Sequence, residues 1–224
     1  MDGVSFSLAG AQLLALGSGA LWWPETRILC VSDLLLGSSD ETRPQSAQGH
    51  TSHTTRDTLI RLETDLQLTH AATVICLGDS FDTPDTGITL PEQDRLWISR
   101  LQAGRRWVWI EGVHDAGPVA LGGSHLAVLP VPPLSFRHQA MSTQSGEVSG
   151  CFHPRVQMQT RLRSTSRPAF LFDSDRVILP SYAGQTRPRP GHEGTLSALM
   201  RREAQAIVTG PTPRIIDMPR ETAV

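Results

Sequence analysis

Residues 73–79, Thr-Val-Ile-Cys-Leu-Gly-Asp, place an almost continuously apolar run directly before a glycine and a carboxylate. A short run that is apolar on both faces is typical of a strand buried inside a parallel sheet. Two similar runs, at 27–31 and 107–110, stand on either side of it, each separated by a segment long enough for a helix. Strands that alternate with helices in this way predict a parallel sheet with right-handed crossovers, and therefore an α/β fold.

The other elements follow from hydrophobic periodicity and capping residues. Helices are predicted over 56–69, which Thr54 or Thr55 can cap, and from Pro91 to about 101. Alternating or short apolar runs predict further strands at 5–8, 12–16, 126–129, 147–151, 169–172 and 177–179. Three polar or Gly/Pro-rich stretches are predicted to be irregular: 37–52, 139–146 and 187–194. No repeat or boundary interrupts this pattern, so we expect a single domain over 1–224.

Composition narrows the classes of function. The 224 residues are 39% apolar and 19% charged, as in an ordinary globular domain. The net charge of −2 gives no general attraction to DNA or to an anionic membrane, so nucleic-acid binding would need a local patch. No apolar stretch could span a membrane, and three scattered cysteines form no disulfide framework, so we expect a cytoplasmic protein with no membrane partner. The chain has no lysine and no asparagine, which excludes a lysine phosphate clamp and an Asn metal ligand.

Carboxylates and imidazoles recur where the predicted strands end. Because the carboxyl ends of parallel strands meet at one edge of a sheet, we expect these side chains to converge. Oxygen and nitrogen donors gathered in this way suit divalent metals. The strand ends in question are Val31-Ser32-Asp33, Leu77-Gly78-Asp79, Glu111-Gly112-Val113-His114-Asp115, Phe136-Arg137-His138 and Gly150-Cys151-Phe152-His153.

The order of these motifs resembles that of the calcineurin-like metallophosphoesterases, which carry Asp-x-His, Gly-Asp, Gly-Asn-His-Asp, a lone His and Gly-His-x-His. Residues 33–153 match this order, and the stretches 19–24, 77–81, 109–110 and 179–183 resemble the bacterial DNA ligase-associated branch. The resemblance implies a β-sandwich of mixed sheets flanked by helices. It also implies a two-metal phosphodiesterase or nuclease, with DNA as the substrate and DNA-repair proteins as partners.

Three positions depart from the family pattern. Leu35 stands where the family has a His ligand, and Val113 stands where it has an Asn ligand. An alkyl side chain has no lone pair to donate, so both ligands are lost. Cys151 stands where the family has the first His of its last motif, and a thiolate can still bind zinc.

The resemblance assigns a role to each remaining position. Two half-sites would share Asp79, and a divalent cation, zinc or manganese, would bind as one ion rather than two. His114 would protonate the leaving group, and Asp115 would orient its imidazole. The metal ligands would be Asp33, Asp79, His138, Cys151 and His153.

Structural explanations remain open beside these roles. Asp33 and Asp79 could cap the turns that follow their strands, and Cys151 could be a small buried hydrophobic residue. Phosphate-loop, serine-elbow and Cys-x-x-Cys motifs are absent from the sequence. Two hypotheses therefore stand: a phosphodiesterase of reduced or altered metal dependence, linked to DNA repair, or an inactive protein that keeps the scaffold to bind a repair partner or a nucleic-acid end.

Overall fold

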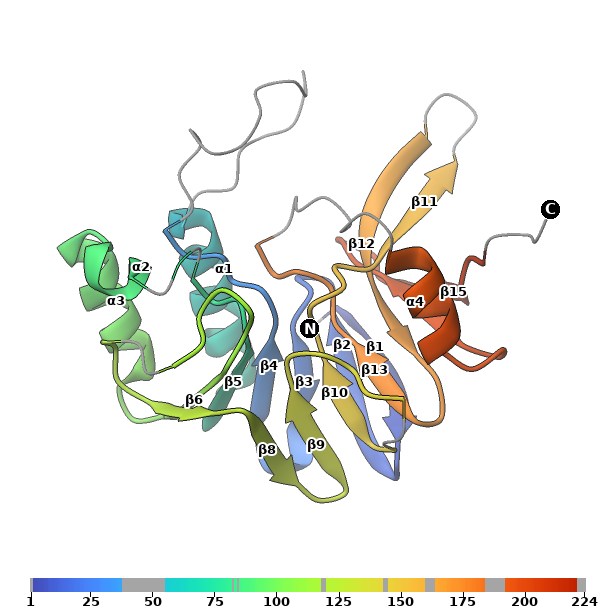
Figure 1. Ribbon diagram of the computed structural model, residues 1–224, viewed down its shortest axis with the longest axis horizontal. Helices are drawn as coiled ribbons and strands as arrows, with labels where there is room; N and C mark the ends of the chain where they lie inside the picture. Colours follow the sequence, from blue (N-terminus) through green and yellow to red (C-terminus); the bar gives the residue numbers. More distant parts are fainter. Residues whose placement is uncertain are drawn as a thin grey trace.

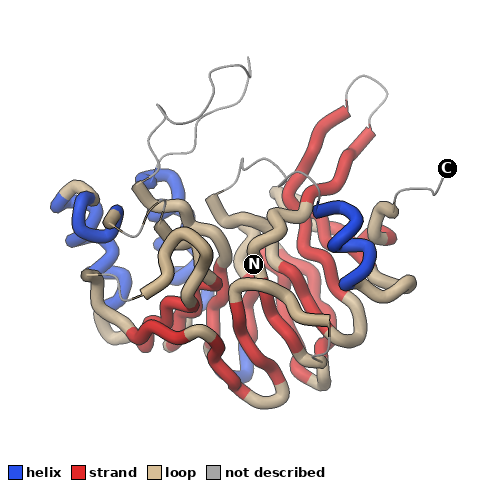
Figure 2. The backbone as a smooth tube through the Cα atoms, in the orientation of Figure 1, coloured by secondary structure: helices blue, strands red, loops and turns tan. Residues whose placement is uncertain are grey.

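Two β-sheets packed face to face form the centre of the molecule, and helices cover their outer sides (Figure 1). The computed structural model describes residues 2–37, 55–81, 83, 85–117, 120–142, 145–159, 164–183 and 192–220. Strands make up most of the ordered structure in this part of the chain, as Figure 2 shows.

The first sheet has seven strands in the order of the sequence. Strands β1 to β4 pair antiparallel with their neighbours, whereas strands β4 to β7 pair parallel. Helices α1 (Thr55–Thr69) and α3 (Glu92–Gln102) pack on its outer side, and the short elements η1 (Pro24–Thr26) and α2 (Thr86–Thr89) lie in its connections. Its strands are β1 (Gly3–Leu8), β2 (Ala11–Leu16), β3 (Leu21–Trp23), β4 (Ile28–Val31), β5 (Thr73–Leu77), β6 (Arg106–Ile110) and β7 (Ser124–Leu126).

The second sheet is also mixed and has the order β15-β14-β12-β13-β10-β9-β8, with β11 paired to β12. Strands β9, β10 and β13 run parallel to one another, and the other pairs are antiparallel. Helix α4 (His192–Leu199) covers its outer side. Its strands are β8 (Val128–Val131), β9 (Leu134–Arg137), β10 (Glu147–Ser149), β11 (Arg155–Gln159), β12 (Ser164–Phe172), β13 (Arg176–Ile178), β14 (Gln205–Val208) and β15 (Arg214–Asp217).

Apolar side chains fill three layers between these elements. The central layer joins the two sheets through residues such as Phe6, Ile75, Phe136 and Phe170. A second layer lies under α1 and α3, and a third lies under α4. Burial of this apolar surface is the main force that holds the sheets together, and it leaves the strand ends free to carry polar groups.

The predicted α/β class with mixed sheets is confirmed, and so are the helices predicted at 56–69 and from Pro91. The prediction of one strand over 126–129 is wrong, because the strand structure is interrupted there between the end of β7 and the start of β8. α4 begins at His192, inside a stretch that was predicted to be irregular, and β3, β11, β14 and β15 were not predicted. Most of the irregular stretch predicted over 37–52 lies outside the described residues. No helix in the described part of the chain is long and apolar enough to cross a membrane.

Candidate functional site

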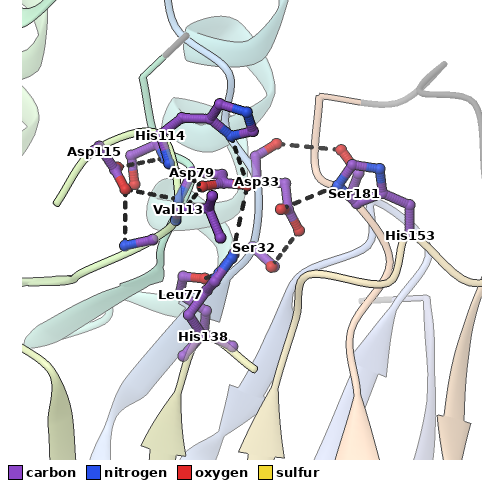
Figure 3. Close-up of polar contacts among 12 residues, drawn as sticks. Ser32, Asp33, Leu77, Asp79, Val113, His114, Asp115, His138, His153 and Ser181 are labelled. Atoms are coloured by element: carbon purple, nitrogen blue, oxygen red, sulfur yellow. Dashed lines mark hydrogen bonds and ion pairs between the residues drawn. The ribbon is translucent and has the colours of Figure 1, made fainter. Parts of the chain in front are cut away.

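The predicted site residues follow five strands whose carboxyl ends face the same way within each sheet. β4, β5 and β6 of the first sheet lead into Asp33, Asp79 and the loop 111–115. β9 and β10 of the second sheet lead into His138 and residues 151–153, and β13 runs parallel to them. In Figure 3 the side chains of Asp33, Asp79, His114, His138 and His153 point toward one another beyond the ends of the strands. The pairing of parallel strands therefore brings the two halves of the sequence to one place.

Strained backbone marks the same residues. Among the described residues, eight non-glycine residues have positive φ, and five of them belong to these motifs. Their φ values are 53° for Asp33, 48° for Leu35, 47° for Asp79, 72° for Cys151 and 47° for His153. Such conformations are uncommon for residues with a side chain and cluster where function requires a particular side-chain direction. Leu35 keeps the strained conformation although its side chain cannot bind a metal.

Two motif glycines permit the close approach of the loops. A Cβ on Gly78 would lie 2.5 Å from Nδ1 of His138, and φ there is +74°. A Cβ on Gly112 would overlap the backbone nitrogen and the carboxylate of Asp79. Glycine is therefore required at both positions because the neighbouring loop occupies the space of a side chain.

Asp79 is the centre of the cluster and is fully buried, with 0% exposure of its side chain. Its Oδ1 accepts hydrogen bonds from the backbone nitrogens of Val113 (2.8 Å) and His114 (3.0 Å). Its Oδ2 lies 3.1 Å from Nδ1 of His114 and 3.6 Å from Nε2 of His138. Burial raises the pKa of Asp79, but these hydrogen bonds and the two imidazoles lower it more, so the net shift is downward. Asp79 is thus held as an anion.

His138 points one ring nitrogen into this cluster. Its Nδ1 lies 2.7 Å from the carbonyl oxygen of Leu77 and can donate to it, which leaves Nε2 facing Asp79. A backbone carbonyl that fixes the ring in this way is typical of metal-binding histidines. Burial lowers the pKa of His138, but the Cys151 sulfur and the charges of Asp33 and Asp79 raise it to about 9. Among the described residues, Nε2 meets no partner at strict hydrogen-bond geometry, and Oδ2 of Asp79 lies 3.6 Å away.

Asp33 forms a second pair with His153. Its Oδ1 lies 3.1 Å from Nε2 of His153, and Ser32 donates its hydroxyl to Oδ2. The segment after β13 fastens this loop: Ser181 donates to the carbonyl of Asp33 (3.2 Å), and the backbone nitrogen of Tyr182 donates to that of Ser32 (2.7 Å). Neither Ser32 nor Ser181 was predicted as part of the site. Their positions beside a strand-end carboxylate and after a buried strand are the sequence signals that could have found them.

Within the part of the chain that the structure describes, several buried polar atoms of the cluster make no hydrogen bond of normal geometry, although Oδ1 of Asp33 and Nε2 of His153 lie 3.1 Å apart. They are Oδ1 of Asp33, Nε2 of His138 and both ring nitrogens of His153. Buried polar atoms are normally satisfied, so each of these needs an explanation. A carboxylate oxygen and imidazole nitrogens are donors that divalent metals accept, and in this respect the residues fit such an ion. Across the described ranges, however, no three His, Cys, Asp or Glu side chains gather as one ready ligand set, and the candidates stand in pairs.

The three replaced positions differ in their surroundings. Leu35 is half-buried, whereas Val113 is 64% exposed and contributes its backbone nitrogen to Asp79. Cys151 is buried against apolar residues that include Phe152, and its sulfur lies near His138. Cys151 therefore combines the packing of a small apolar residue with a place beside the cluster.

Asp115 does not orient His114, contrary to the prediction. Its carboxylate accepts hydrogen bonds from the backbone nitrogens of Asp79 (2.9 Å), Ser80 (2.7 Å) and Gly112 (2.9 Å). These three donors turn both oxygens toward the loop backbone. The imidazole of His114, which is 49% exposed, is held by Asp79 instead.

A tyrosine connects the site to α1. The hydroxyl of Tyr182 donates to Oδ2 of Asp65 (2.8 Å), and Nη1 of Arg61 donates to the carbonyl of Tyr182 (2.6 Å). Tyr182 is completely buried, and Asp65 is buried among the leucines of α1. Sequence reasoning missed this pair. A carboxylate on the apolar face of a predicted helix was the signal that α1 must meet a buried donor.

Comparison with known proteins identifies a relative in fold. No family model matches this chain, and no curated protein matches it. Among solved structures, the Pseudomonas putida nuclease MPE superposes with a TM-score of 0.72 over 95% of this chain and 100% of that chain, at 23% sequence identity. At this identity the likeness concerns the backbone arrangement. The chain therefore shares the fold of that bacterial nuclease.

Proposed function

We propose that this chain is a metal-dependent phosphodiesterase of the nuclease type, with a calcineurin-like fold and a role in DNA repair. The observation that supports it most is a set of buried atoms that lack a hydrogen bond of normal geometry among the described residues: Oδ1 of Asp33, Nε2 of His138 and Nε2 of His153. They lie where parallel strands of both sheets end, which is where α/β proteins bind their ligands. The shared fold with a nuclease supports the same class of substrate.

A divalent ion would be held by residues from both sheets. Asp33 and His153 would be ligands at one half-site, and His138 and Cys151 would be ligands at the other. Asp79 would be a ligand at either half-site. The loss of two ligands at Leu35 and Val113 favours one ion over two. Such an ion supplies Lewis-acid polarisation of the phosphoryl group.

His114 is placed to handle a proton. Its Nδ1 lies 3.1 Å from Oδ2 of Asp79, so the carboxylate fixes the orientation of the ring. The half-exposed ring leaves Nε2 available to substrate, and in the imidazolium form Nε2 can give its proton to the departing oxygen. Asp115 acts indirectly, because it holds the backbone of Asp79 and Gly112.

One observation favours the alternative of an inactive binding protein. The imidazoles already stand within 3.1–3.6 Å of the two carboxylates, so each negative charge has a protein partner without any cation. Together with the replacements at Leu35 and Val113, this arrangement could serve a scaffold that binds a repair partner or a nucleic-acid end without cleaving it.

Metal content and two alanine variants separate the two proposals. For an enzyme, Asp79→Ala should remove both bound metal and hydrolysis of a chromogenic phosphodiester. His114→Ala should retain metal and slow hydrolysis by roughly 10²–10⁴-fold, the usual contribution of a positioned proton donor. Metal is measured by elemental analysis of protein purified without chelator, then again after dialysis against zinc or manganese.

The wild-type chain is the control for folding and for adventitious hydrolase. A melting temperature that rises with zinc or manganese in the wild type, and not in Asp79→Ala, would support a bound ion. Suppose that neither zinc nor manganese changes the melting temperature of the wild type, and that the wild type hydrolyses the diester no faster than His114→Ala does. This result would contradict the proposal of an enzyme and favour the inactive binding protein.

A further inference from the structure

A two-stranded ribbon, β11 with the first half of β12, extends beyond the sandwich (Figure 1). β11 begins at Arg155, two residues after His153. β12 is antiparallel to β13 with Leu171 opposite Ile178, so the residues before Leu171 continue past the carboxyl end of β13. That end leads into Ser181, which bonds the Asp33 loop. The ribbon therefore rises at the same edge of the molecule as the candidate site.

Side-chain alternation defines the two faces of the ribbon. Phe170 of β12 belongs to the central layer between the sheets, so Ser166 and Ser164, at even spacing from it, lie on that inner side. Their partner across the ladder, Gln157 opposite Ser166, shares this side, and so does Arg155 opposite Pro168. Val156 and Met158 lie on the other side with the residues under α4. The inner face of the projecting ribbon therefore lies on the side of the second sheet that faces the first sheet, which is the side on which Asp33 and His153 meet.

The inner face is polar and its surroundings in the sequence are basic. Between Glu147 and Asp173 the chain has four arginines and no acidic residue, although its overall net charge is −2. Arg155 is held on this face by hydrogen bonds from Nε to the Ser166 hydroxyl (2.9 Å) and from Nη2 to the Ser166 carbonyl (2.7 Å). Gln157 and Ser164 are exposed and lie within hydrogen-bond distance of each other (3.4 Å). On the described inner face, Arg155 is therefore a cation among neutral polar side chains, whereas Arg167 lies opposite Val156 on the outer side.

We propose that the inner face of this ribbon, formed by Arg155, Gln157, Ser164 and Ser166, binds the sugar-phosphate backbone of a nucleic-acid strand that enters the site. This inference rests on the proposed function, because it takes the phosphodiester to be part of a polynucleotide. Arginine, serine and glutamine side chains supply most phosphate contacts in protein–nucleic-acid complexes, and these contacts position the strand without reading its sequence. A ribbon beside the site would hold the strand on one side of the bond to be cut.

Negative charges introduced on the inner face of the ribbon test this proposal. The double variant Gln157→Glu/Ser164→Glu should weaken binding of a fluorescent oligonucleotide by about tenfold at low salt and reduce the salt dependence of the affinity. Binding is followed by anisotropy in the presence of chelator, so that no cleavage occurs. Arg155→Ala should show a similar loss, and the double variant keeps the test valid if removal of Arg155 unfolds the ribbon.

Two controls place the effect on the inner face. Thr165→Glu adds a negative charge to the exposed outer side of the same ribbon, and Gln67→Glu adds one to the exposed surface of α1. Both should bind the oligonucleotide within about twofold of the wild type at matched salt. The inner-face variant adds two negative charges and Thr165→Glu adds one, so an equal loss of binding free energy per added charge would overturn the proposal, because it would reflect net charge alone.

Hydrolysis of a small chromogenic diester by the wild type separates this proposal from the proposed function. Binding that falls only in the inner-face variants supports the ribbon even if the wild type hydrolyses nothing, an outcome that would overturn the nuclease instead. Hydrolysis by the wild type with oligonucleotide affinity unchanged in every inner-face variant would overturn the ribbon alone. In an active protein, the inner-face variants should lower the rate ratio of oligonucleotide to small-diester cleavage.

Discussion

Asp79 and Asp115 are two buried carboxylates in adjoining loops, and they serve different purposes. Both oxygens of Asp115 accept hydrogen bonds from the backbone, namely from the nitrogens of Asp79, Ser80 and Gly112. Asp79 gives only Oδ1 to the backbone, and its Oδ2 faces the imidazoles of His114 and His138. The first carboxylate holds the loops in shape, while the second turns one oxygen toward the imidazoles.

The pKa values of the two groups move in opposite directions. Burial raises the pKa of both. For Asp79 the hydrogen bonds of His114 and the charges of the imidazoles outweigh burial, and its pKa falls. For Asp115 burial outweighs three backbone hydrogen bonds, and the negative charge of Asp79 raises its pKa further. Burial alone therefore does not distinguish a structural carboxylate from a functional one; the partners of the second oxygen do.

The largest effect on stability is expected at Asp115. Asp115→Ala would leave three buried backbone N–H groups without an acceptor, at about 1–3 kcal/mol each, so the free energy of unfolding should fall by roughly 3 kcal/mol or more. Urea denaturation measures it. The matched change Asp79→Asn keeps an oxygen for Val113 and His114 and removes the charge that faces the two imidazoles, so it should cost less than Asp115→Ala does. Equal losses in the two variants would contradict the division of roles.

Tyr182→Phe should have the next largest effect. It removes the hydroxyl that donates to Asp65 and leaves the backbone of Tyr182 to hold Ser32. A hydrogen bond to a buried charged group contributes about 2 kcal/mol, so the variant should unfold more easily by that amount. Metal content and hydrolysis should stay those of the wild type. A variant of normal stability that loses metal would mean that the hydroxyl acts on the site and not on the scaffold.

Restoring the missing ligands tests whether the site is merely depleted. Leu35 has a φ of 48°, a conformation that His tolerates better than a branched apolar residue does, so Leu35→His should fit the backbone. Val113 is exposed, so Val113→Asn buries no polar group. Leu35→His/Val113→Asn should raise diester hydrolysis by at least about tenfold, the lower end of what partners of metal ligands contribute. Each single variant is a control. A folded double variant that takes up more metal without faster hydrolysis would show that the site lacks more than these two ligands.

The sequence was enough to predict the parallel strands and the side chains at their ends. Asp33, Asp79 and His138 could be placed because a buried strand has a recognisable apolar run and its carboxyl end has a fixed position in the sheet. The five positive φ angles at these motifs agree with that placement.

Contacts between residues far apart in the sequence could not be predicted from it. Tyr182 meets Asp65 across 117 residues of sequence, and no local pattern encodes such a contact. Asp115 was misread for a related reason, because its neighbour in sequence is His114 but its hydrogen bonds go to other loops. The edge strand β15 was missed because a short edge strand lacks the continuous apolar run of a buried strand, whereas β14 is an interior strand whose short apolar run, Ala206-Ile207-Val208, was overlooked.

The smallest effect should appear as a pH dependence of stability that comes from Asp65. Burial raises the pKa of this carboxyl above its ordinary value of 3.8, and the hydrogen bonds of Ser18 and Tyr182 and the charge of Arg61 only partly offset the rise. The folded state therefore binds the proton more tightly than the unfolded state does, so the stabilisation is complete below the unfolded pKa and is lost as pH rises through the folded pKa. Asp65→Asn cannot titrate, although it still accepts the Tyr182 hydroxyl. The stability of the wild type relative to this variant should be greatest in acid and decrease toward neutral pH, as measured by urea denaturation at a series of pH values. A difference that grows toward neutral pH would mean that Asp65 resembles Asp79, with an anion that its partners favour, and would remove the contrast between the two kinds of buried carboxylate.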